Sequence, residues 1–222
     1  MMEKPQIIKK ELNMNLNFMS DLKREDIKFL IIHHTGVSLD QRVETINNFH
    51  KNDRGWAGIG YHFYIRQNGS IYRGRPITKQ GVHTSSVNSK SLAVCLAGNF
   101  NSNKPEEFPD QKEALIDLLA WLSHEFPNTT LEKNREFNNT SCPGDNFNIH
   151  QIREEVESRI NEKKDLPNIS RRINGKFDGE DFKGTAYLIE SRVYIPVRVL
   201  EDYFDVTVSW NRETQEFQID KR

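Results

Sequence analysis

The sequence predicts an α/β (α+β) fold in which a mixed central β-sheet is flanked by helices, followed by a second, smaller α+β domain. As far as residue 165, short β-rich runs and amphipathic helical segments follow one another, which is typical of strands and helices built around one sheet. Beyond Pro167 the chain changes to short strands and polar turns. With 222 residues, 36% of them hydrophobic, we expect a domain at 1–166 and a small module at 167–222.

The first domain is predicted to begin with a polar lead-in, a buried strand and a helix. Residues 1–26 are weakly patterned and are expected to be extended. The run Lys28–His34 is apolar almost throughout, as a central strand buried on both faces would be. In Asp40–Asn52 apolar residues recur at helical spacing, and Asp40 is suited to the N-cap. The apolar residues of this helix are Val43, Ile46 and Phe49.

A hairpin and a third strand are predicted next. The glycine-rich loop Gly55–Gly60 leads into a strand, and Asn68-Gly69 is the strongest short signal for a hairpin turn. The following run should therefore return antiparallel to that strand. The predicted strands are Tyr61–Ile65, Ser70–Arg73 and Leu92–Gly98, with a loop of small residues at Gly81–Ser91.

Two amphipathic helices are predicted at Pro109–Phe126 and Phe147–Lys164. In each, large apolar residues fall on one face, and Pro167 closes the second helix. The stripes consist of Leu115, Leu118, Leu119, Trp121 and Leu122 in the first helix, and of Ile149, Ile152, Val156 and Ile160 in the second.

The C-terminal module contains neither Cys nor His, so we expect it to bind or pack rather than to carry chemistry. A hairpin is predicted from Val206–Trp210 to Glu216–Asp220, across Asn211–Thr214. A helix is predicted at Pro196–Phe204, with proline at its first position. The remaining strands are predicted near Arg171–Asn174, Lys183–Ile189 and Arg192–Ile195.

Charge and hydropathy exclude several classes of partner. The 31 Lys and Arg residues are balanced by 32 Asp and Glu residues, so no basic excess indicates nucleic acid. No apolar run is long enough for a membrane span, and the N-terminal residues lack the apolar core of a secretion signal. Cys95 lies in the apolar run Leu92–Ala97 and is expected to be a core residue rather than a disulfide partner of Cys142.

The candidate site begins with the loop Phe137–Gly144, where Cys142 stands among turn residues. His33 lies far upstream, at the end of the predicted buried strand. Imidazole and thiolate are preferred zinc ligands, and a catalytic zinc keeps one position for water. Adjacent strand residues point to opposite faces, so His34 is interpreted as a packed or hydrogen-bonded histidine rather than a second ligand. The alternative for Cys142 is a free loop thiol.

Five segments, in order, resemble the zinc-dependent N-acetylmuramoyl-L-alanine amidases of the phage lysozyme and peptidoglycan-recognition-protein type (amidase type 2). They are His33–Gly36, Gly60–Phe63, Gly81–Thr84, Leu92–Phe100 and Arg135–Gly144, and the likeness covers roughly residues 25–160. The resemblance implies cleavage of the amide between the muramic acid lactyl group and L-alanine of the stem peptide. It also implies a Zn²⁺ ion held by two histidines and a cysteine, which activates water and polarises the carbonyl.

The resemblance also implies roles for individual residues. The zinc ligands correspond to His33 and Cys142, the catalytic residues to Tyr61 and Thr140, and the substrate-binding residues to His83, Trp56 and Arg73. Tyr61 would stabilise the oxyanion or orient water, and its alternative is an ordinary half-buried strand aromatic. The alternative for His83 is a purely structural loop residue. A glutamate that some branches carry in the third strand is absent, and Cys95 lies near its position. The helical residues His50, His124 and His150 are interpreted as surface or packing histidines.

One departure from the family pattern concerns the second zinc histidine, which precedes the cysteine by eight residues. Here that position is Asn134. An amide oxygen is a poor zinc ligand beside imidazole, so zinc binding should be weakened by several kcal/mol. Either the site is compromised, or the metal is held more loosely by His33, Cys142 and waters.

The sequence thus predicts a peptidoglycan hydrolase, an endolysin or autolysin that acts on the cell wall after release from the cytoplasm. The first alternative is a catalytically impaired peptidoglycan-binding protein, because of Asn134; the second is a zinc amidase acting on another amide. The segment Val193–Arg198, with Val208–Trp210, resembles the copper-amine-oxidase N-terminal-like repeat of surface proteins, without implying copper. This module is expected to serve wall attachment or self-association, which would allow a homodimer.

Overall fold

The computed structural model describes residues 2–165 and, further along the chain, residues 176–177, 180–181, 187–189, 192–194, 206–211 and 216–221. Contacts between residues divide the chain into two compact units, Met1–Lys163 and Lys164–Arg222. This division falls close to the boundary predicted after residue 166. The two units are described separately.

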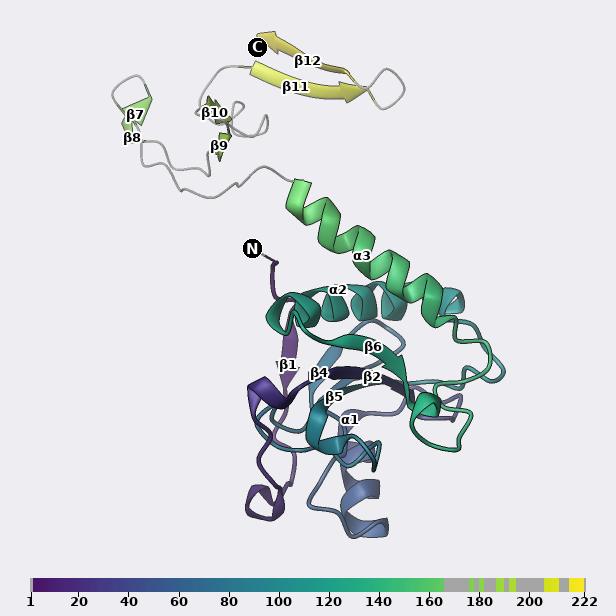
Figure 1. Cartoon of the computed structure of the whole chain (residues 1–222). Helices are drawn as coiled ribbons and strands as arrows, with labels where there is room; N and C mark the ends of the chain where they lie inside the picture. Colours follow the sequence, from purple (N-terminus) through teal and green to yellow (C-terminus); the bar gives the residue numbers. More distant parts are fainter. Residues whose placement is uncertain are drawn as a thin grey trace. The chain divides into compact units, whose positions relative to one another are not determined.

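A six-stranded mixed sheet forms the centre of the first unit, which confirms the predicted fold class. The strands are β1 (Ile7–Lys9), β2 (Phe29–His34), β3 (Phe63–Ile65), β4 (Ile71–Arg73), β5 (Ser91–Leu96) and β6 (Thr130–Lys133), in the spatial order β1-β4-β3-β5-β2-β6. Strands β3 and β4 form the predicted antiparallel hairpin, whereas the other neighbouring strands are parallel. Strand β2 is buried between β5 and β6, as its apolar sequence predicts (Figure 1).

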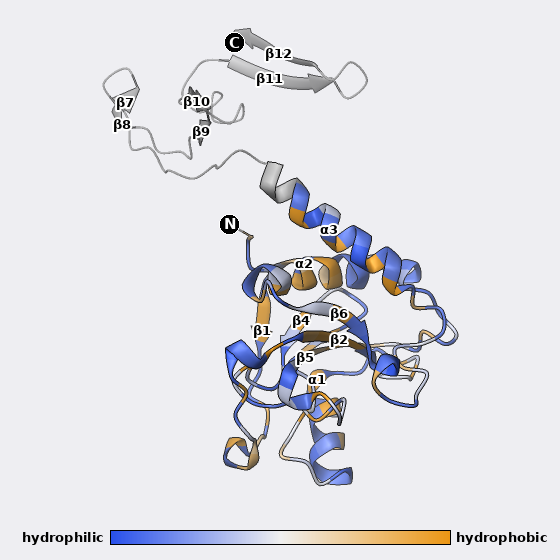
Figure 2. Ribbon diagram, viewed as in Figure 1, coloured by the Kyte–Doolittle hydropathy of each residue, from blue (hydrophilic) through white to orange (hydrophobic). Residues whose placement is uncertain are grey.

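Helices cover both faces of this sheet. Helices α2 (Pro109–Glu125) and α3 (Ile149–Asp165) lie on one face and α1 (Val43–Asn48) on the other (Figure 1). The larger core joins β2 and β5 to α2 and α3, whose leucine and isoleucine stripes are buried as predicted. Figure 2 shows these apolar residues along the central strands and α2. The smaller core joins α1 to the opposite face through Tyr64 and Cys95.

The observed helix differs from the one predicted at Asp40–Asn52 both in where it begins and in the type of its second half. The α-helix begins at Val43, and after Asn48 it continues as a π-helix over Phe49–Asp53. The Asp40 carboxylate does not cap it; it accepts hydrogen bonds from Arg66 at 2.7 Å and from the backbone N–H of Gln67 at 3.0 Å. Phe49 is 44% exposed rather than part of the apolar face.

Two strands are not predicted by the sequence, and both lie at the edges of the sheet. Strand β1 falls in the segment expected to be an extended lead-in, and β6 contains a single apolar residue, Leu131. Each pairs with one strand only, so neither needs a continuous apolar run. Strand β3 also begins at Phe63 rather than at Tyr61. Short 3-10 turns occur at Leu16–Phe18, Arg24–Asp26, Asn88–Lys90, Pro105–Glu107 and Asn134–Glu136.

The described parts of the second unit are three antiparallel strand pairs. The predicted hairpin is confirmed as β11 (Val206–Asn211) paired with β12 (Glu216–Lys221). The other pairs are β7 (Lys176–Phe177) with β8 (Glu180–Asp181) and β9 (Tyr187–Ile189) with β10 (Arg192–Tyr194). The predicted strand at 171–174 and helix at 196–204 lie outside the described residues. Among the helices that the structure describes, none combines the length and apolar character needed to cross a membrane.

Candidate functional site

The candidate site lies on the sheet face that α1 covers, towards the end of β2. Parallel pairing places His33 of β2 beside Cys95 of β5, and Tyr64 of β3 beside Cys95 on its other side. Residues in register on neighbouring strands project to the same face. His33 therefore projects away from the larger core and towards the loops that carry Tyr61, His83 and Cys142.

Side chains of the surrounding loops contact both nitrogen atoms of the His33 ring. The Nδ1 atom lies 3.6 Å from the sulfur of Cys142. The Nε2 atom lies 3.1 Å from Nδ1 of His83 and 3.3 Å from the hydroxyl of Thr84. When Nε2 carries the proton and donates it on this side, Nδ1 presents a lone pair towards the sulfur. The hydrogen bonds at Nε2 thus fix the tautomer and orientation of His33 so that Nδ1 could bind a metal, as hydrogen bonds to the second ring nitrogen do in known metal sites.

The loop of Cys142 is fixed by bonds at both of its ends. The backbone N–H of Arg135 donates to the carbonyl of Cys142 at 3.0 Å, and the Arg135 guanidinium binds Asp145 at 2.8 Å. Gly144 has a φ of +120°, and a Cβ there would lie 2.2 Å from the backbone of Phe100. Only glycine allows this close approach. The thiol is consequently held in place and is 8% exposed.

Asn134 lies inside the site, 7% exposed, and its carboxamide oxygen is engaged twice. The oxygen accepts hydrogen bonds from the hydroxyl of Thr84 at 3.0 Å and from the amide of Asn138 at 2.8 Å. The acceptor of this side chain, the atom that could face a metal, is therefore occupied by donors of the protein itself.

The aromatic residues of the prediction line one side of the site. The Tyr61 ring lies 5.2 Å from that of His33 and 5.4 Å from that of His50, and the Trp56 ring lies 4.7 Å from His50. His50 is a buried packing residue, because its Nδ1 accepts the N–H of Gly60 at 3.1 Å. His124 and His150 are exposed on their helices.

Three other residues named by the sequence lie at the margin of the site or outside it. Thr140 is exposed, and its hydroxyl accepts the N–H of Cys142 at 3.3 Å. The Nδ1 of His34 accepts the N–H of Phe100 at 3.1 Å, which confirms it as a hydrogen-bonded histidine. The structure does not bring Arg73 to the site: its guanidinium lies 5.1 Å above the ring of Phe63, which belongs to the core on the opposite face of the sheet.

Burial determines the protonation of the central groups. Burial, with a contribution from His34, lowers the pKa of His33 to about 3, so the ring is neutral at pH 7. Burial also raises the pKa of the Cys142 thiol, although hydrogen bonds from the His34 backbone and the Asn134 side chain oppose the rise. Burial raises the pKa of Tyr61 well above its ordinary value, so its hydroxyl remains a donor. A metal bound here would therefore have to displace the thiol proton.

His33 and Cys142 fit two positions of a zinc site, but the third position does not fit. With bonds of about 2.0 Å to nitrogen and 2.3 Å to sulfur, two ligands of a tetrahedral zinc lie about 3.5 Å apart. The 3.6 Å between Nδ1 and the sulfur matches this separation. The oxygen of Asn134 already accepts two hydrogen bonds, and His83 lies on the other edge of the His33 ring. Among the residues described by the structure, no group of three or more His, Cys, Asp or Glu side chains is placed to hold a metal ion.

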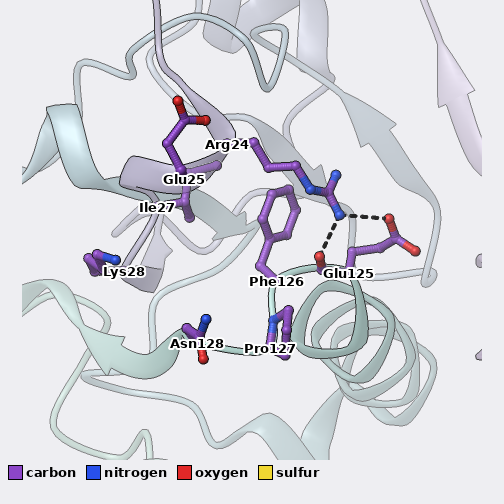
Figure 3. A pocket seen from close by; sticks show the side chains of 8 residues that line it. All are labelled: Arg24, Glu25, Ile27, Lys28, Glu125, Phe126, Pro127 and Asn128. Atoms are coloured by element: carbon purple, nitrogen blue, oxygen red, sulfur yellow. Dashed lines mark hydrogen bonds and ion pairs between the residues drawn. The ribbon is translucent and has the colours of Figure 1, made fainter.

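A pocket of about 300 Å³ lies elsewhere, between the residues preceding β2 and the end of α2 (Figure 3). Arg24 donates to the carbonyl of Glu125 at 2.5 Å and to its carboxylate at 3.2 Å, and it lies 4.4 Å above the ring of Phe126. This pocket adjoins Ile27 and Lys28 at the start of β2, whereas His33 is near the end of that strand. It is therefore separate from the candidate site.

Comparison with known proteins identifies the class to which this fold and site belong. The sequence profile of the N-acetylmuramoyl-L-alanine amidase family matches residues 23–145. The chain belongs to this family. It is 32% identical to an endolysin of Klebsiella phage KP32 over 126 residues, which are 54% of this chain and 83% of the endolysin. It is 30% identical to peptidoglycan-recognition protein SC2 of Drosophila melanogaster over 130 residues, covering 54% and 70% of the two chains.

Solved structures give the same result. The endolysin and N-acetylmuramoyl-L-alanine amidase LysCS from Clostridium intestinale superposes with a TM-score of 0.62 at 33% identity, covering 70% of this chain and 98% of that one. Peptidoglycan-recognition protein LE superposes with a TM-score of 0.57 at 25% identity, covering 68% of this chain and 92% of that one. That structure was solved in complex with tracheal cytotoxin, a monomeric diaminopimelic acid-type peptidoglycan. The relatives are thus named both for cleaving peptidoglycan and for recognising it.

Sequence reasoning did not assign a role to Thr84 or to Cys95. Thr84 is fully buried and contacts His33, His83 and Asn134. Its position directly after His83, in a segment already matched to the family, is the signal that could have identified it. Cys95 was predicted to be a core residue, which its full burial confirms, and its place between His33 and Tyr64 follows from the register of β5 with β2 and β3.

Proposed function

We propose that this chain binds bacterial peptidoglycan at the junction between muramic acid and L-alanine, and that Asn134 impairs hydrolysis of the amide there. The observation that carries this proposal concerns Asn134, at the position where the family pattern expects the third ligand: its carboxamide oxygen already accepts two hydrogen bonds from the protein. Family membership supports peptidoglycan as the ligand.

The remaining groups suit recognition of an amide. Tyr61 keeps its proton at neutral pH and lies against His33, where its hydroxyl would donate to the carbonyl oxygen of the substrate. Trp56 and His83 extend the same group of rings, with His83 contacting His33 directly. Thr140 is exposed beside Cys142, and its hydroxyl hydrogen is available for a hydrogen bond to substrate.

A second candidate function is zinc-dependent N-acetylmuramoyl-L-alanine amidase activity, as in an endolysin or autolysin. The 3.6 Å between His33 Nδ1 and the Cys142 sulfur favours it, because this separation suits a shared zinc ion. In this case the bond cleaved is the amide, since the proposed site contains no pair of carboxylates for cleaving a glycosidic bond. Residues 167–222 are proposed to attach the protein to the wall or to another copy of the chain.

The test combines binding and product analysis on purified cell-wall sacculi. The parent protein is expected to co-sediment with sacculi while releasing few new amino groups, and Asn134→His is expected to release stem peptides with L-alanine at the N-terminus. Neither protein should create new reducing sugar ends. A parent protein that does not co-sediment would refute recognition, and a parent that cleaves as fast as Asn134→His would establish the second candidate.

A further inference from the structure

A smaller pocket, of about 190 Å³, lies where α1 begins and where β1 and β4 form one edge of the sheet. It is lined by Lys10, Arg42, Val43, Glu44, Arg66 and Tyr72. We call it the basic pocket, because three of these residues are cationic and one is acidic. Strands β3 and β5 separate β4 from β2, which carries His33, so the basic pocket is distinct from the candidate site.

The protein holds the wall of the basic pocket in place. Arg66 directly follows β3, and its Nη2 donates to the carboxylate of Asp40 at 2.7 Å. The hydroxyl of Tyr64 donates to the carbonyl of Gln41 at 2.9 Å. These two bonds fix the segment that leads into Arg42, so the pocket is formed before any ligand binds.

The positive charges of the basic pocket are only partly balanced. The side chains of Lys10 and Arg42 form no hydrogen bond or ion pair with any other residue in the described part of the chain. Asp40 engages Nη2 of Arg66, which leaves Nη1 for a further acceptor. Glu44 is the one acid that lines the pocket. Unpaired cations around a polar cavity attract an anion.

We propose that the basic pocket binds a phosphate group, either of the free ion or of a phosphodiester polymer. Its three cations stand on three different elements, after β1, before α1 and after β3. A tetrahedral phosphate presents oxygens in several directions, whereas a planar carboxylate presents two in one plane. Arginine binds phosphate through a fork of N–H groups, and lysine adds a point charge. The proposal does not depend on which ligand the candidate site binds.

The experiment measures the affinity of the full-length chain for inorganic phosphate by isothermal titration calorimetry at constant ionic strength. Acetate is the reference anion. Arg42→Ala should weaken phosphate binding about tenfold, as expected for the loss of one charge-assisted hydrogen bond. Lys90→Ala removes the same charge from an exposed position outside the pocket, and it should leave the affinity unchanged.

Glu44→Gln changes the pocket in the opposite direction. Because it removes the negative charge that opposes the anion, it should tighten phosphate binding about threefold. This variant keeps the test decisive if Arg42→Ala fails to fold. Competition with poly(glycerol phosphate) then distinguishes the two sources: a polymer that displaces inorganic phosphate identifies a phosphodiester as the ligand, and a polymer that does not displace it identifies the free ion.

Three results overturn the proposal. The first is a parent chain that binds phosphate no more tightly than acetate. The second is an equal loss of affinity in Arg42→Ala and Lys90→Ala, because the effect would then be one of net charge. The third is an unchanged affinity in Glu44→Gln. None of these readouts uses peptidoglycan, so failure here is distinguishable from failure of the proposed function.

Discussion

The replacement Asn134→His should convert the site into one whose stability depends on zinc. An imidazole at this position adds the third ligand to His33 and Cys142 and leaves a fourth place for water. At a zinc concentration one hundred times the dissociation constant, binding stabilises the folded chain by about 2.7 kcal/mol. For a domain of this size each kcal/mol raises the thermal midpoint by about 2–4 °C, so zinc should raise it by about 5–10 °C.

Without zinc the same variant should be less stable than the parent chain. The substitution removes the hydrogen bonds that Asn134 accepts from Thr84 and Asn138. Loss of such buried bonds costs about 1–3 kcal/mol. The two proteins should therefore exchange their order of stability when zinc is added.

Differential scanning calorimetry in chelator and in zinc-buffered solution measures this exchange. Asn138→His is the matched control, because Asn138 lies in the same loop and contacts Asn134 without reaching the sulfur. It should show no zinc-dependent rise. The reasoning is refuted if Asn134→His melts at the same temperature in both buffers, or if the parent chain shows the same rise.

Three further predictions follow from the site and the fold. In the Asn134→His background, Cys142→Ser should abolish the zinc-dependent rise in thermal midpoint, and a rise that persists would show that Cys142 is not a ligand. In that background, a chain ending at Asp165 should keep its turnover on soluble muropeptides and lose retention on sacculi; loss of turnover in the folded, shortened chain would contradict this. Acid should destabilise the parent chain, because burial lowers the pKa of His62 to about 4, while the unfolded chain protonates this residue near 6.5. The contribution of His62 is complete above pH 6.5 and is lost as the pH falls towards 4, which amounts to about 2 kcal/mol between pH 7 and 5. Burial also lowers the pKa of His33, His34 and His50, so the loss measured by urea unfolding should exceed this amount. An unfolding free energy that does not change over this range would contradict the last prediction.

The sequence predicts those parts of the fold whose buried residues form a continuous apolar run or an apolar stripe with helical spacing. The apolar run of β2 and the stripes of α2 and α3 identify elements that contact the larger core. Strands β1 and β6 could not be found in this way, because their pairing depends on partners far along the chain. Asp40 has the composition of an N-cap, but a tertiary ion pair with Arg66 engages its carboxylate.

In the site, too, local motifs predict some features, whereas others depend on residues far apart in the sequence. Family motifs correctly predict that His33, Tyr61, His83 and Cys142 lie together. Arg73 lies in β4, outside the five segments that resemble the family, and its register with Phe63 directs it to the opposite face of the sheet. The carboxamide oxygen of Asn134 is held by Thr84, which is distant in sequence, so only the structure shows that this oxygen is already engaged.

The central claim is that the chain offers zinc two fitting ligands, His33 and Cys142, and that Asn134, whose oxygen is held by Thr84 and Asn138, does not supply the third. Metal analysis of the purified parent chain and of Asn134→His, both equilibrated in the same zinc-buffered solution, tests it most directly. We predict that Asn134→His retains one zinc ion per chain and that the parent chain retains none. A parent chain that holds one zinc ion per chain as tightly as Asn134→His would contradict the claim.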